Sequence, residues 1–293
     1  MKNLIKKIVP QAIRIKRLEY LKHRKKIKIV KYLKRSSEFD DEEKKEIVNY
    51  FAKNPLAVFP YEFTKKYNPK DVVVHTDNEN NMKCVWHEKK RLYFKKNWSE
   101  EKIQNYYNGI LLEQDVESSH RYETADFYVK ENDVVVDVGV AEGNFALSVV
   151  EKAKKIYLFE IDEEWIDVLK ITFAPWKEKV EIVCKYVSDK DSDSSITLDT
   201  FFSDKQKVDF IKADIEGAEI AMLKGGQSTL SNTENQRIVL CAYHKQNDAK
   251  EIDTKLKEAG FHTAFSKNHM IFYLDKTLDA PFLRKGVVYA VKK

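Results

Sequence analysis

The segment around residues 134–139 constrains the fold most. Its unbroken apolar run, Val134-Val135-Val136, leads through Asp137 into a glycine turn. A fully apolar strand is typical of a sheet that is covered on both faces, as parallel sheets are. Further short runs alternate with helical patterns, which predicts an α/β fold with a mostly parallel sheet and helices on both faces.

The expected strands of this sheet are 134–136, 155–160, 180–185, 208–213 and 237–243, and the expected helices are about 143–153, 162–173, 217–224 and 248–259. Two further β-like runs, at about 270–274 and 286–291, finish the chain. If these two runs pair as a hairpin, one of them adds an antiparallel strand near the C-terminus.

The first 35 residues differ from the rest in charge. They contain fourteen Lys or Arg and one acid, Glu19, and so carry +13 in a chain whose total is +5. Leu, Ile and Val at near-helical spacing predict a basic amphipathic helix or pair of helices, broken at Pro10. Such an arm either contacts an anionic surface, such as a membrane, or is a solvated helix. Its only rings are Tyr20 and Tyr32, which argues against a base-stacking surface for nucleic acid.

The region between the arm and the alternating pattern predicts smaller elements. They are a helix over 39–53, a short strand at 72–74, a hairpin of 84–86 with 91–94, and a helix from Ser99 to about residue 114. Asp40 and Asp41 favour the start of the first helix, and Glu100 and Glu101 that of the second. We therefore expect a basic helical and small β extension over residues 1–110 and a second domain over 111–293.

The cysteines and the apolar runs indicate a compartment. Three cysteines without a C-x-x-C spacing argue against a disulfide framework or a zinc site and fit a reducing environment. Apolar stretches stay below the length of a membrane span, and the N-terminus lacks the apolar core of a signal peptide. The expected location is cytoplasmic, with or without peripheral membrane contact.

The glycine turn after the first strand has the spacing D-x-G-x-x-x-G, from Asp137 through Gly139 to Gly143. Glycine in a strand–turn–helix context lets the backbone turn tightly and lets a ligand approach closely. The third glycine of the dinucleotide fingerprint is absent, which argues against an NAD-dependent oxidoreductase. Glu160 ends the second strand 23 residues after Asp137, where an acid can accept both ribose hydroxyls of an adenosine.

Polar side chains also follow the fourth and fifth strands. Asp214 and Glu216 come directly after the strand at 208–213, and His244 follows the strand at 237–243. Because parallel strands present their carboxyl ends at one edge of the sheet, we expect the three side chains to lie together. A histidine there suits a general base for a hydroxyl, or the three residues could share a divalent metal such as Mg²⁺.

A polar cluster precedes the first strand of the sheet. It comprises Glu113-Gln114-Asp115 and Ser118-Ser119-His120-Arg121-Tyr122. This cluster either touches a cofactor or acceptor or is a solvated surface loop, and the residues favour neither.

Together the three motifs resemble the FkbM-type family of S-adenosylmethionine-dependent methyltransferases. The resemblance rests on D-x-G-x-x-x-G-x-F, an acid ending strand two, and K-x-D-x-E-G-A-E with a following L-x-G, and it covers about residues 130–245. The family often has Ala-Asn where this chain has Val140-Ala141, and Glu-Pro where it has Glu160-Ile161. These departures keep the carboxylates but leave the subfamily, and so the substrate, open.

The resemblance implies a Rossmann-like class I methyltransferase sheet and S-adenosylmethionine as cofactor. Expected cofactor contacts are Asp137, Val138, Gly139, Ala141, Gly143, Asn144, Phe145, Glu160, Ile161, Val187, Ser188 and Asp214, with Val187 and Ser188 beside the adenine ring. Expected catalytic residues are His244, Asp214 and Glu216. The leading hypothesis is O-methylation of a sugar or glycan-linked hydroxyl. The alternatives are an NAD-dependent oxidoreductase and a non-catalytic membrane- or nucleic-acid-binding module that uses the basic arm.

Overall fold

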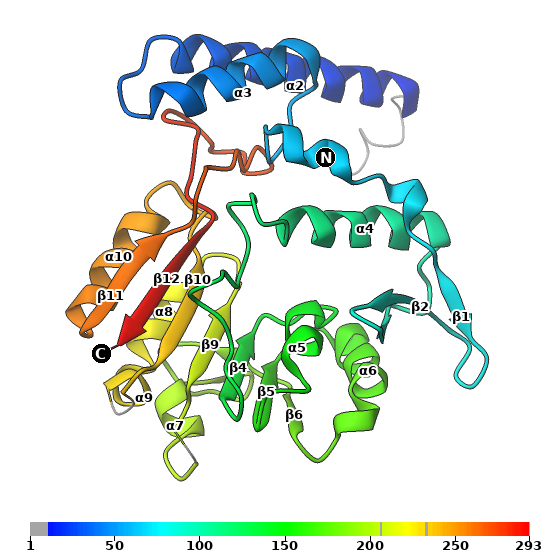
Figure 1. Cartoon of the computed structure of the whole chain (residues 1–293), viewed down its shortest axis with the longest axis vertical. Coiled ribbons are helices and arrows are strands. Elements are labelled where there is room, and N and C mark those ends of the chain that lie inside the picture. Colours follow the sequence, from blue (N-terminus) through cyan, green and yellow to red (C-terminus); the bar gives the residue numbers. More distant parts are fainter. Residues whose placement is uncertain (1–10, 206, 232–233, 293) are drawn as a thin grey trace. The chain divides into compact units, whose positions relative to one another are not determined.

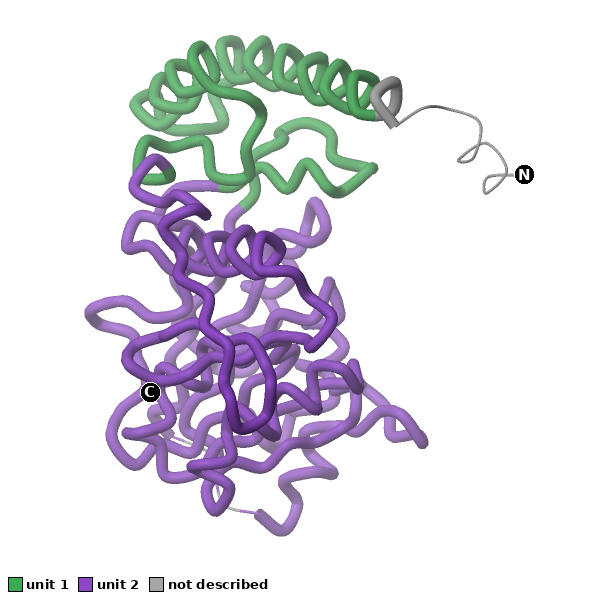
Figure 2. Tube along the Cα trace, turned by 90° about the vertical axis from the view of Figure 1, so that its right-hand side faces the viewer, with its two compact units in different colours: residues 1–64, 270–284 green, residues 65–269, 285–293 purple. Residues whose placement is uncertain are grey.

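A computed structural model describes residues 11–205, 207–231 and 234–292. The chain divides into two compact units, one made of residues up to 64 together with 270–284, the other of 65–269 with 285–293 (Figure 2). The predicted domain boundary at residue 110 lies within α4 (Glu100–Glu113), inside the second unit, and stays a prediction. The predicted helices of residues 1–35 are described only from residue 11, so Pro10 and the residues before it lie outside the described chain.

The second unit is built on a seven-stranded sheet with the order β11-β12-β10-β9-β4-β5-β6 (Figure 1). The strands are β4 (Val134–Val138), β5 (Lys155–Phe159), β6 (Val180–Val183), β9 (Phe210–Ala213), β10 (Arg237–Cys241), β11 (Phe261–Phe265) and β12 (Val287–Lys292). All are parallel except β12, which is antiparallel to both neighbours. The predicted mostly parallel sheet with an antiparallel strand near the C-terminus is therefore confirmed.

Strand order reverses between β4 and β9, because the chain runs outward through β5 and β6 and then returns to the other side of β4. In open α/β sheets, ligands bind outside the carboxyl ends of the strands at such a reversal. The D-x-G-x-x-x-G turn follows β4 and the Asp214 segment follows β9, so the fold brings these two motifs to one point.

Side chains alternate between two buried faces of the sheet, and all five residues of β4 are buried. Val134, Val136 and Val138 belong to the large core cluster. The next elements also supply residues to that cluster: α7 (Leu198–Phe201), α8 (Glu219–Lys224), α9 (Gln227–Ser231) and α10 (Asp248–Glu258). On the other face Phe145 stacks on Phe210, with ring centroids 5.7 Å apart. The remaining elements of this region are α5 (Asn144–Val149), α6 (Glu163–Thr172), η3 (Ala174–Trp176), β7 (Tyr186–Val187) and β8 (Ser195–Ile196).

The C-terminal strands differ from the expectation. The last strand pairs with β10 and with β11, at 261–265, and not with the expected run at 270–274, which contributes only an isolated bridge between Met270 and Arg284. Strand β11 escaped detection because Phe261 is its only fully buried residue, so it lacks the apolar pattern of the central strands. The segment 270–284 belongs instead to the first unit.

The second unit begins with a three-stranded antiparallel sheet, β1 (His75–Asp77), β2 (Met82–His87) and β3 (Lys90–Tyr93), which confirms the predicted hairpin. The first strand begins at His75, just after the expected 72–74 run. Val72 is extended but caps η2 (Pro69–Asp71), and residues 72–74 are not assigned to a strand. Helix α4 follows with Ser99 as its N-cap, as predicted.

The first unit contains α2 (Gln11–Leu33), α3 (Asp41–Lys53) and the 270–284 segment, and the chain leaves it within η1 (Glu62–Lys66). Asp40 caps α3 through the amides of Glu42 and Glu43, as the acidic start predicts. Lys26 of α2 donates to the carbonyls of Phe51 and Asn54, which ties the two helices together. No described helix is both long enough and apolar enough to cross a lipid bilayer.

Candidate functional site

The glycine turn after β4 requires glycine at Gly139. Its φ is +73°, and a Cβ atom there would collide with the backbone carbonyl oxygen of Asp214. Gly143 has φ +88° and lies against Leu169 and Phe173. The turn is therefore pressed against the β9 loop, so the two motifs share one site.

Replacing Gly139 with alanine is expected to lower the free energy of unfolding by about 2–3 kcal/mol, because a left-handed conformation and a backbone collision are both unfavourable for alanine. The control is Gly109→Ala in α4, where a Cβ meets nothing within 4 Å. The control is expected to gain about 0.5–1 kcal/mol of stability, as alanine is the better helix former. Urea denaturation of both variants checks the prediction, and equal effects of the two substitutions would contradict it.

Asp137 does not stand alone at the end of β4. It is 1% exposed and forms an ion pair of 2.9 Å with Lys212, which is directly opposite on β9 and 4% exposed. Lys212 also donates to the carbonyl oxygen of Gly139 at 2.8 Å. Burial raises the pKa of Asp137, and Lys212 opposes that rise. The pair holds the glycine turn onto β9.

Glu160 binds the turn from the other side. Its Oε2 accepts a hydrogen bond of 2.8 Å from the amide of Ala141, and its Oε1 accepts hydrogen bonds from the amides of Ile161 and Asp162. These bonds fix the carboxylate beside the turn, and its contact with an adenosine ribose stays a prediction. Each carboxylate oxygen has about two acceptor positions, so Oε2 keeps one for a hydroxyl.

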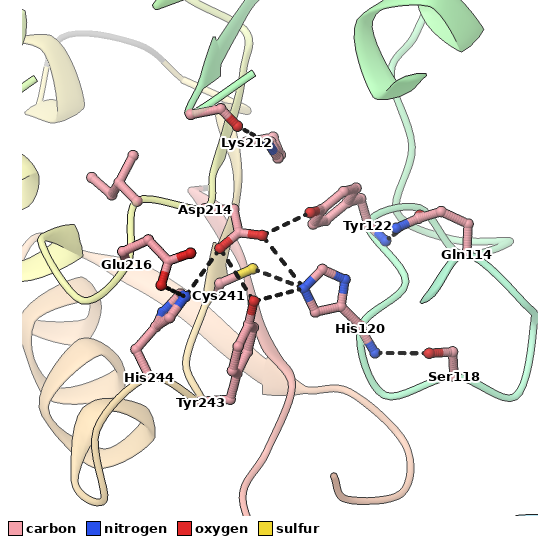
Figure 3. Close-up of polar contacts among 12 residues, drawn as sticks. Gln114, Ser118, His120, Tyr122, Lys212, Asp214, Glu216, Cys241, Tyr243 and His244 are labelled. Atoms are coloured by element: carbon pink, nitrogen blue, oxygen red, sulfur yellow. Dashed lines mark hydrogen bonds and ion pairs between the residues drawn. The ribbon is translucent and has the colours of Figure 1, made fainter. Parts of the chain in front are cut away.

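Asp214 is the centre of a compact polar cluster (Figure 3). One carboxylate oxygen, Oδ1, faces His244 Nε2 at 3.2 Å and the Tyr243 hydroxyl at 3.4 Å. The other, Oδ2, faces the Tyr122 hydroxyl at 3.2 Å and His120 Nε2 at 3.5 Å. Two segments far apart in the sequence thus converge on the strand end that was predicted to carry catalysis.

The cluster stabilises charge. Burial alone would raise the pKa of Asp214, but hydrogen bonds from His120 and His244 bring it well below its usual range. Burial lowers the pKa of both histidines, yet the surrounding carboxylates outweigh it and raise both values. For His120 these carboxylates are Glu113 and Asp214. The ground state is therefore an aspartate anion between two histidines with high proton affinity.

A second carboxylate reaches His244 from α8. Glu219 is 1% exposed, its Oε1 accepts the amide of Ile215, and it lies 3.5 Å from His244 Nδ1. Glu216, by contrast, has a side chain that is 87% exposed and lies 3.7 Å from His244 Nε2. The histidine ring is thus oriented by a buried acid on one nitrogen and by Asp214 on the other.

The predicted metal set was Asp214, Glu216 and His244. Among the described residues, ligand atoms within 4.8 Å of one another occur instead in two other groups, Asp214 with Glu219 and His244, and His120 with Asp214 and Cys241. Ion pairs and hydrogen bonds within the cluster account for both groups without a metal ion.

A cavity of about 330 Å³ opens beside the glycine turn and Asp214. Its size is within the range of small-molecule sites, roughly 300–1,000 Å³. One wall is α4, and the lining includes Tyr106, Glu113, Tyr122, Val140, Glu142 and Lys212 together with the predicted residues Gly139, Ala141, Asn144 and Asp214. Three carboxylates therefore face one cavity whose only lining cation, Lys212, is paired with Asp137.

Glu142 is the acid of this cavity that titrates near neutrality by virtue of its burial. It is 4% exposed and accepts a hydrogen bond of 2.7 Å from the Tyr106 hydroxyl of α4. Burial raises its pKa to about 7, although this hydrogen bond opposes the rise. Burial also raises the pKa of Glu113 on the same helix. The cavity gains negative charge as the pH rises through 7.

The other predicted cofactor residues do not line this cavity. Asp137, Val138, Gly143, Phe145, Glu160, Ile161, Val187 and Ser188 are not among its lining residues, and neither are Glu216 and His244. Val138 and Val187 belong to the hydrophobic core, and Phe145 packs against Tyr122 and Phe210. Cofactor contacts of these residues stay predictions.

The polar cluster at 113–122 is largely buried, and its contact with a cofactor or acceptor stays a prediction. Ser118, Ser119 and His120 are buried, Tyr122 is 6% exposed, and Glu113 and Gln114 line the cavity, so this is no solvated loop. Sequence reasoning missed Lys212, Glu142, Tyr106, Glu219, Cys241 and Tyr243. The lysine offered a signal, because a charged residue within an otherwise apolar strand needs a buried partner.

Comparisons with known proteins agree with the motifs. The family model described as methyltransferase FkbM domain matches residues 126–263. A search of curated proteins gives no match.

Solved structures of methyltransferases are similar at low identity. Methyltransferase FkbM from Methylobacillus flagellatus KT is 16% identical with a TM-score of 0.47, over 65% of this chain and 53% of that chain, so the match spans about half of that protein. A putative methyltransferase from Streptococcus mutans in complex with SAH is 12% identical with a TM-score of 0.39, over 64% of this chain and 97% of that one. A putative RNA methyltransferase from Pyrococcus horikoshii is 22% identical with a TM-score of 0.37, over 56% and 75%.

Proposed function

We propose that this chain, whose residues 126–263 match the family model described as methyltransferase FkbM domain, transfers a methyl group from S-adenosylmethionine to a hydroxyl of a sugar, glycan or related small molecule. The observation that carries the proposal is the contact between Asp214, which lines the cavity, and His244, which suits a hydroxyl acceptor. The choice of a sugar hydroxyl rests on the family resemblance alone.

The charge of the cavity suits that of the methyl donor. S-adenosylmethionine carries a sulfonium and an ammonium group, and its sulfonium supplies an electrophilic methyl group. Glu113, Glu142 and Asp214 would face these positive charges, which are attracted most strongly where water is excluded. Glu160, held by the amides of the turn, would accept the ribose hydroxyls.

His244 would act on the acceptor. In its neutral form, with the remaining proton on Nδ1 facing Glu219, its Nε2 accepts the proton of the attacking hydroxyl as the oxygen forms its bond to the methyl carbon; the carbon–sulfur bond breaks and its electron pair leaves with the sulfur as a neutral thioether. Asp214 and Glu219 stabilise the resulting imidazolium from both ring nitrogens. Positioning contributes the rest of the rate enhancement, because an in-line methyl transfer requires donor and acceptor in near-attack geometry.

Transfer of a labelled methyl group to a panel of glycans and methyl glycosides tests the proposal. We expect His244→Ala to retain cofactor binding but lose turnover, and Glu160→Ala to lose cofactor binding. Full activity of His244→Ala would remove the base assignment. Labelling of an amine but no hydroxyl would overturn O-methylation.

Cofactor affinity is expected to rise with pH because of Glu142. Its pKa of about 7 means that it is largely neutral at lower pH and becomes a carboxylate at higher pH. A cationic ligand favours that carboxylate, so binding should tighten by up to about tenfold between about pH 6 and pH 8. Calorimetric titrations with S-adenosylmethionine at both pH values measure the change. The same titrations with Glu142→Gln measure the part of the pH dependence that comes from the cofactor itself. If this variant kept the pH dependence of wild type, the assignment of the effect to Glu142 would be contradicted.

An NAD-dependent oxidoreductase remains the alternative on a similar sheet. The D-x-G-x-x-x-G turn lacks the dinucleotide fingerprint, and the cavity beside it is acidic, which disfavours a pyrophosphate. A thermal-shift comparison of NAD with S-adenosylhomocysteine separates the two. Stabilisation by NAD alone would replace the methyltransferase proposal.

We also propose that the basic arm contacts an anionic membrane surface. In α2 the side chains of Ile15, Leu18 and Leu21 are 47%, 59% and 49% exposed, among Lys and Arg residues that also face solvent. Exposed apolar groups within a basic helix are typical of interfacial binding. We expect Leu18→Asp/Leu21→Asp to lose sedimentation with phosphatidylserine vesicles. Equal binding of wild type to neutral vesicles, or binding to RNA only, would refute the proposal.

A further inference from the structure

A second cavity lies on a different face of α4 from the cavity beside the glycine turn. Its volume is about 240 Å³, and it is open to solvent on one side. Its lining comes from η1, η2, β1, β2 and α4 of the second unit, and Figure 1 labels the last three of these elements. We call it the aromatic cavity, because Tyr67, His75, Trp86 and Tyr107 all line it. Neither the resemblance nor the proposed methyl transfer assigns it a role.

The walls of the aromatic cavity combine ring faces with few available polar groups. The hydroxyl of Tyr67 donates to Asp115, and that of Tyr107 contacts His87 and the Trp86 carbonyl. These hydroxyls are engaged, so the rings serve mainly as apolar walls. Trp86 remains 51% exposed, which is high for so large an apolar side chain.

One polar group in the wall lacks a partner. Asn108 is 7% exposed, lines the cavity, and its Oδ1 is buried without a hydrogen-bond partner. Leaving such an acceptor unsatisfied is costly, and a ligand donor would recover that cost. The group therefore indicates a ligand that carries a hydroxyl or amide donor.

Charge and size narrow the ligand class. Lys66 forms ion pairs with Asp115 and Glu117, and the only other charged residue in the lining is the acid Asp71, so an anionic ligand is disfavoured. The volume is below the roughly 300–1,000 Å³ of drug-sized sites, which favours a single ring. A neutral ring with an apolar C–H face for Trp86 and a hydroxyl for Asn108 meets both conditions.

We propose that the aromatic cavity is a binding site for one sugar ring, which stacks on Trp86 and donates a hydroxyl hydrogen bond to Asn108 Oδ1. The site is distinct from the cavity assigned to the methyl donor, since α4 contributes different residues to each. Binding at this site does not depend on methyl transfer, so the two proposals can fail separately.

Saturation-transfer NMR with the full chain, a panel of methyl glycosides and no methyl donor tests the site. We expect transfer to the C–H protons of one ring face, and unchanged transfer after excess S-adenosylhomocysteine is added. Trp86→Ala and Asn108→Leu should each weaken binding about tenfold, as expected for the loss of one ring contact or one hydrogen bond. Tyr128→Ala is the control, an exposed aromatic residue outside the cavity.

Stability separates a binding role from a structural one. Because Asn108→Leu removes an unsatisfied buried acceptor, its melting temperature should be equal to or above that of wild type. If Asn108→Leu unfolds instead, the test of the binding site rests on Trp86→Ala alone, since the Trp86 side chain is half exposed. Absence of transfer from every glycoside, equal binding by wild type and Trp86→Ala, or transfer only to indole or adenine would each overturn the proposal.

Discussion

Replacing Lys212 with methionine is expected to lower the free energy of unfolding by about 3–5 kcal/mol, the usual cost of removing one partner from a buried ion pair. Lys212 is 4% exposed and is paired at 2.9 Å with Asp137, which is 1% exposed. Methionine keeps most of the length of the side chain, an unbranched chain one atom shorter, but leaves the Asp137 carboxylate without its cation. The protein should compensate by protonating Asp137, whose pKa burial already raises.

The sign of the pH effect follows from that burial. Once Lys212 is gone, the folded-state pKa of Asp137 rises further, so the variant should be least unstable at acid pH and weaken as the pH rises. Chemical denaturation at several pH values measures the loss. The double variant Lys212→Met/Asp137→Asn should recover much of it, because the buried charge is then absent. A single variant as stable as wild type, or a double variant that is worse than the single one, would contradict this account.

Replacing Asp214 with asparagine is expected to reduce turnover by about 10²–10⁴-fold, the range for loss of effective acid–base catalysis. Asparagine keeps the shape of the side chain but removes the anion that faces both His120 and His244. Asp214 helps to raise the pKa of both histidines, so the substitution should lower both values. His244 then becomes a weaker base and its imidazolium loses its counter-charge.

The pH–rate profile distinguishes this role from a general loss of structure. A base must be deprotonated to act, so wild-type activity should rise with pH through the raised pKa of His244. In Asp214→Asn the rising limb should move to lower pH while the plateau falls. Asp167→Asn is the matched control, with a side chain 76% exposed on α6. A lower plateau with no movement of the limb would assign Asp214 to cofactor binding alone.

Much of the sheet followed from local sequence pattern. The strands β4, β5, β9 and β10 are short apolar runs between turn residues, and their shortness and flanking residues favour buried strands over helices. Strand order then placed Asp214 and His244 at one edge, because parallel strands present their carboxyl ends together. Their contact at 3.2 Å confirms that reasoning.

The contacts that the sequence could not predict depend on strand register and on segments that are far apart in the chain. The Asp137–Lys212 pair requires that β4 and β9 be adjacent in one particular register, which neither strand specifies by itself. Tyr106 and Glu142 meet across 36 residues because α4 lies over the glycine turn. Strand β11 alternates polar and apolar residues too weakly to be separated from a loop.

The polar cluster around Asp214 shows the same limit, because the sequence does not reveal which acids belong to the site. Glu219 at the start of α8 suits an ordinary interaction with the helix dipole, yet it faces His244 Nδ1 at 3.5 Å. A helix-start acid and a site acid have the same sequence signature. Only the position of β10 beside β9 distinguishes them.

The central claim is that the turn after β4 and the carboxylate of Glu160 together bind the adenosine of the methyl donor. Calorimetric titration of the intact chain with S-adenosylhomocysteine tests it most directly, since no acceptor is required. The account predicts saturable binding of one molecule per chain, abolished in Glu160→Ala and retained in His244→Ala. Absence of binding by the folded wild-type chain, or unchanged affinity in Glu160→Ala, would contradict it.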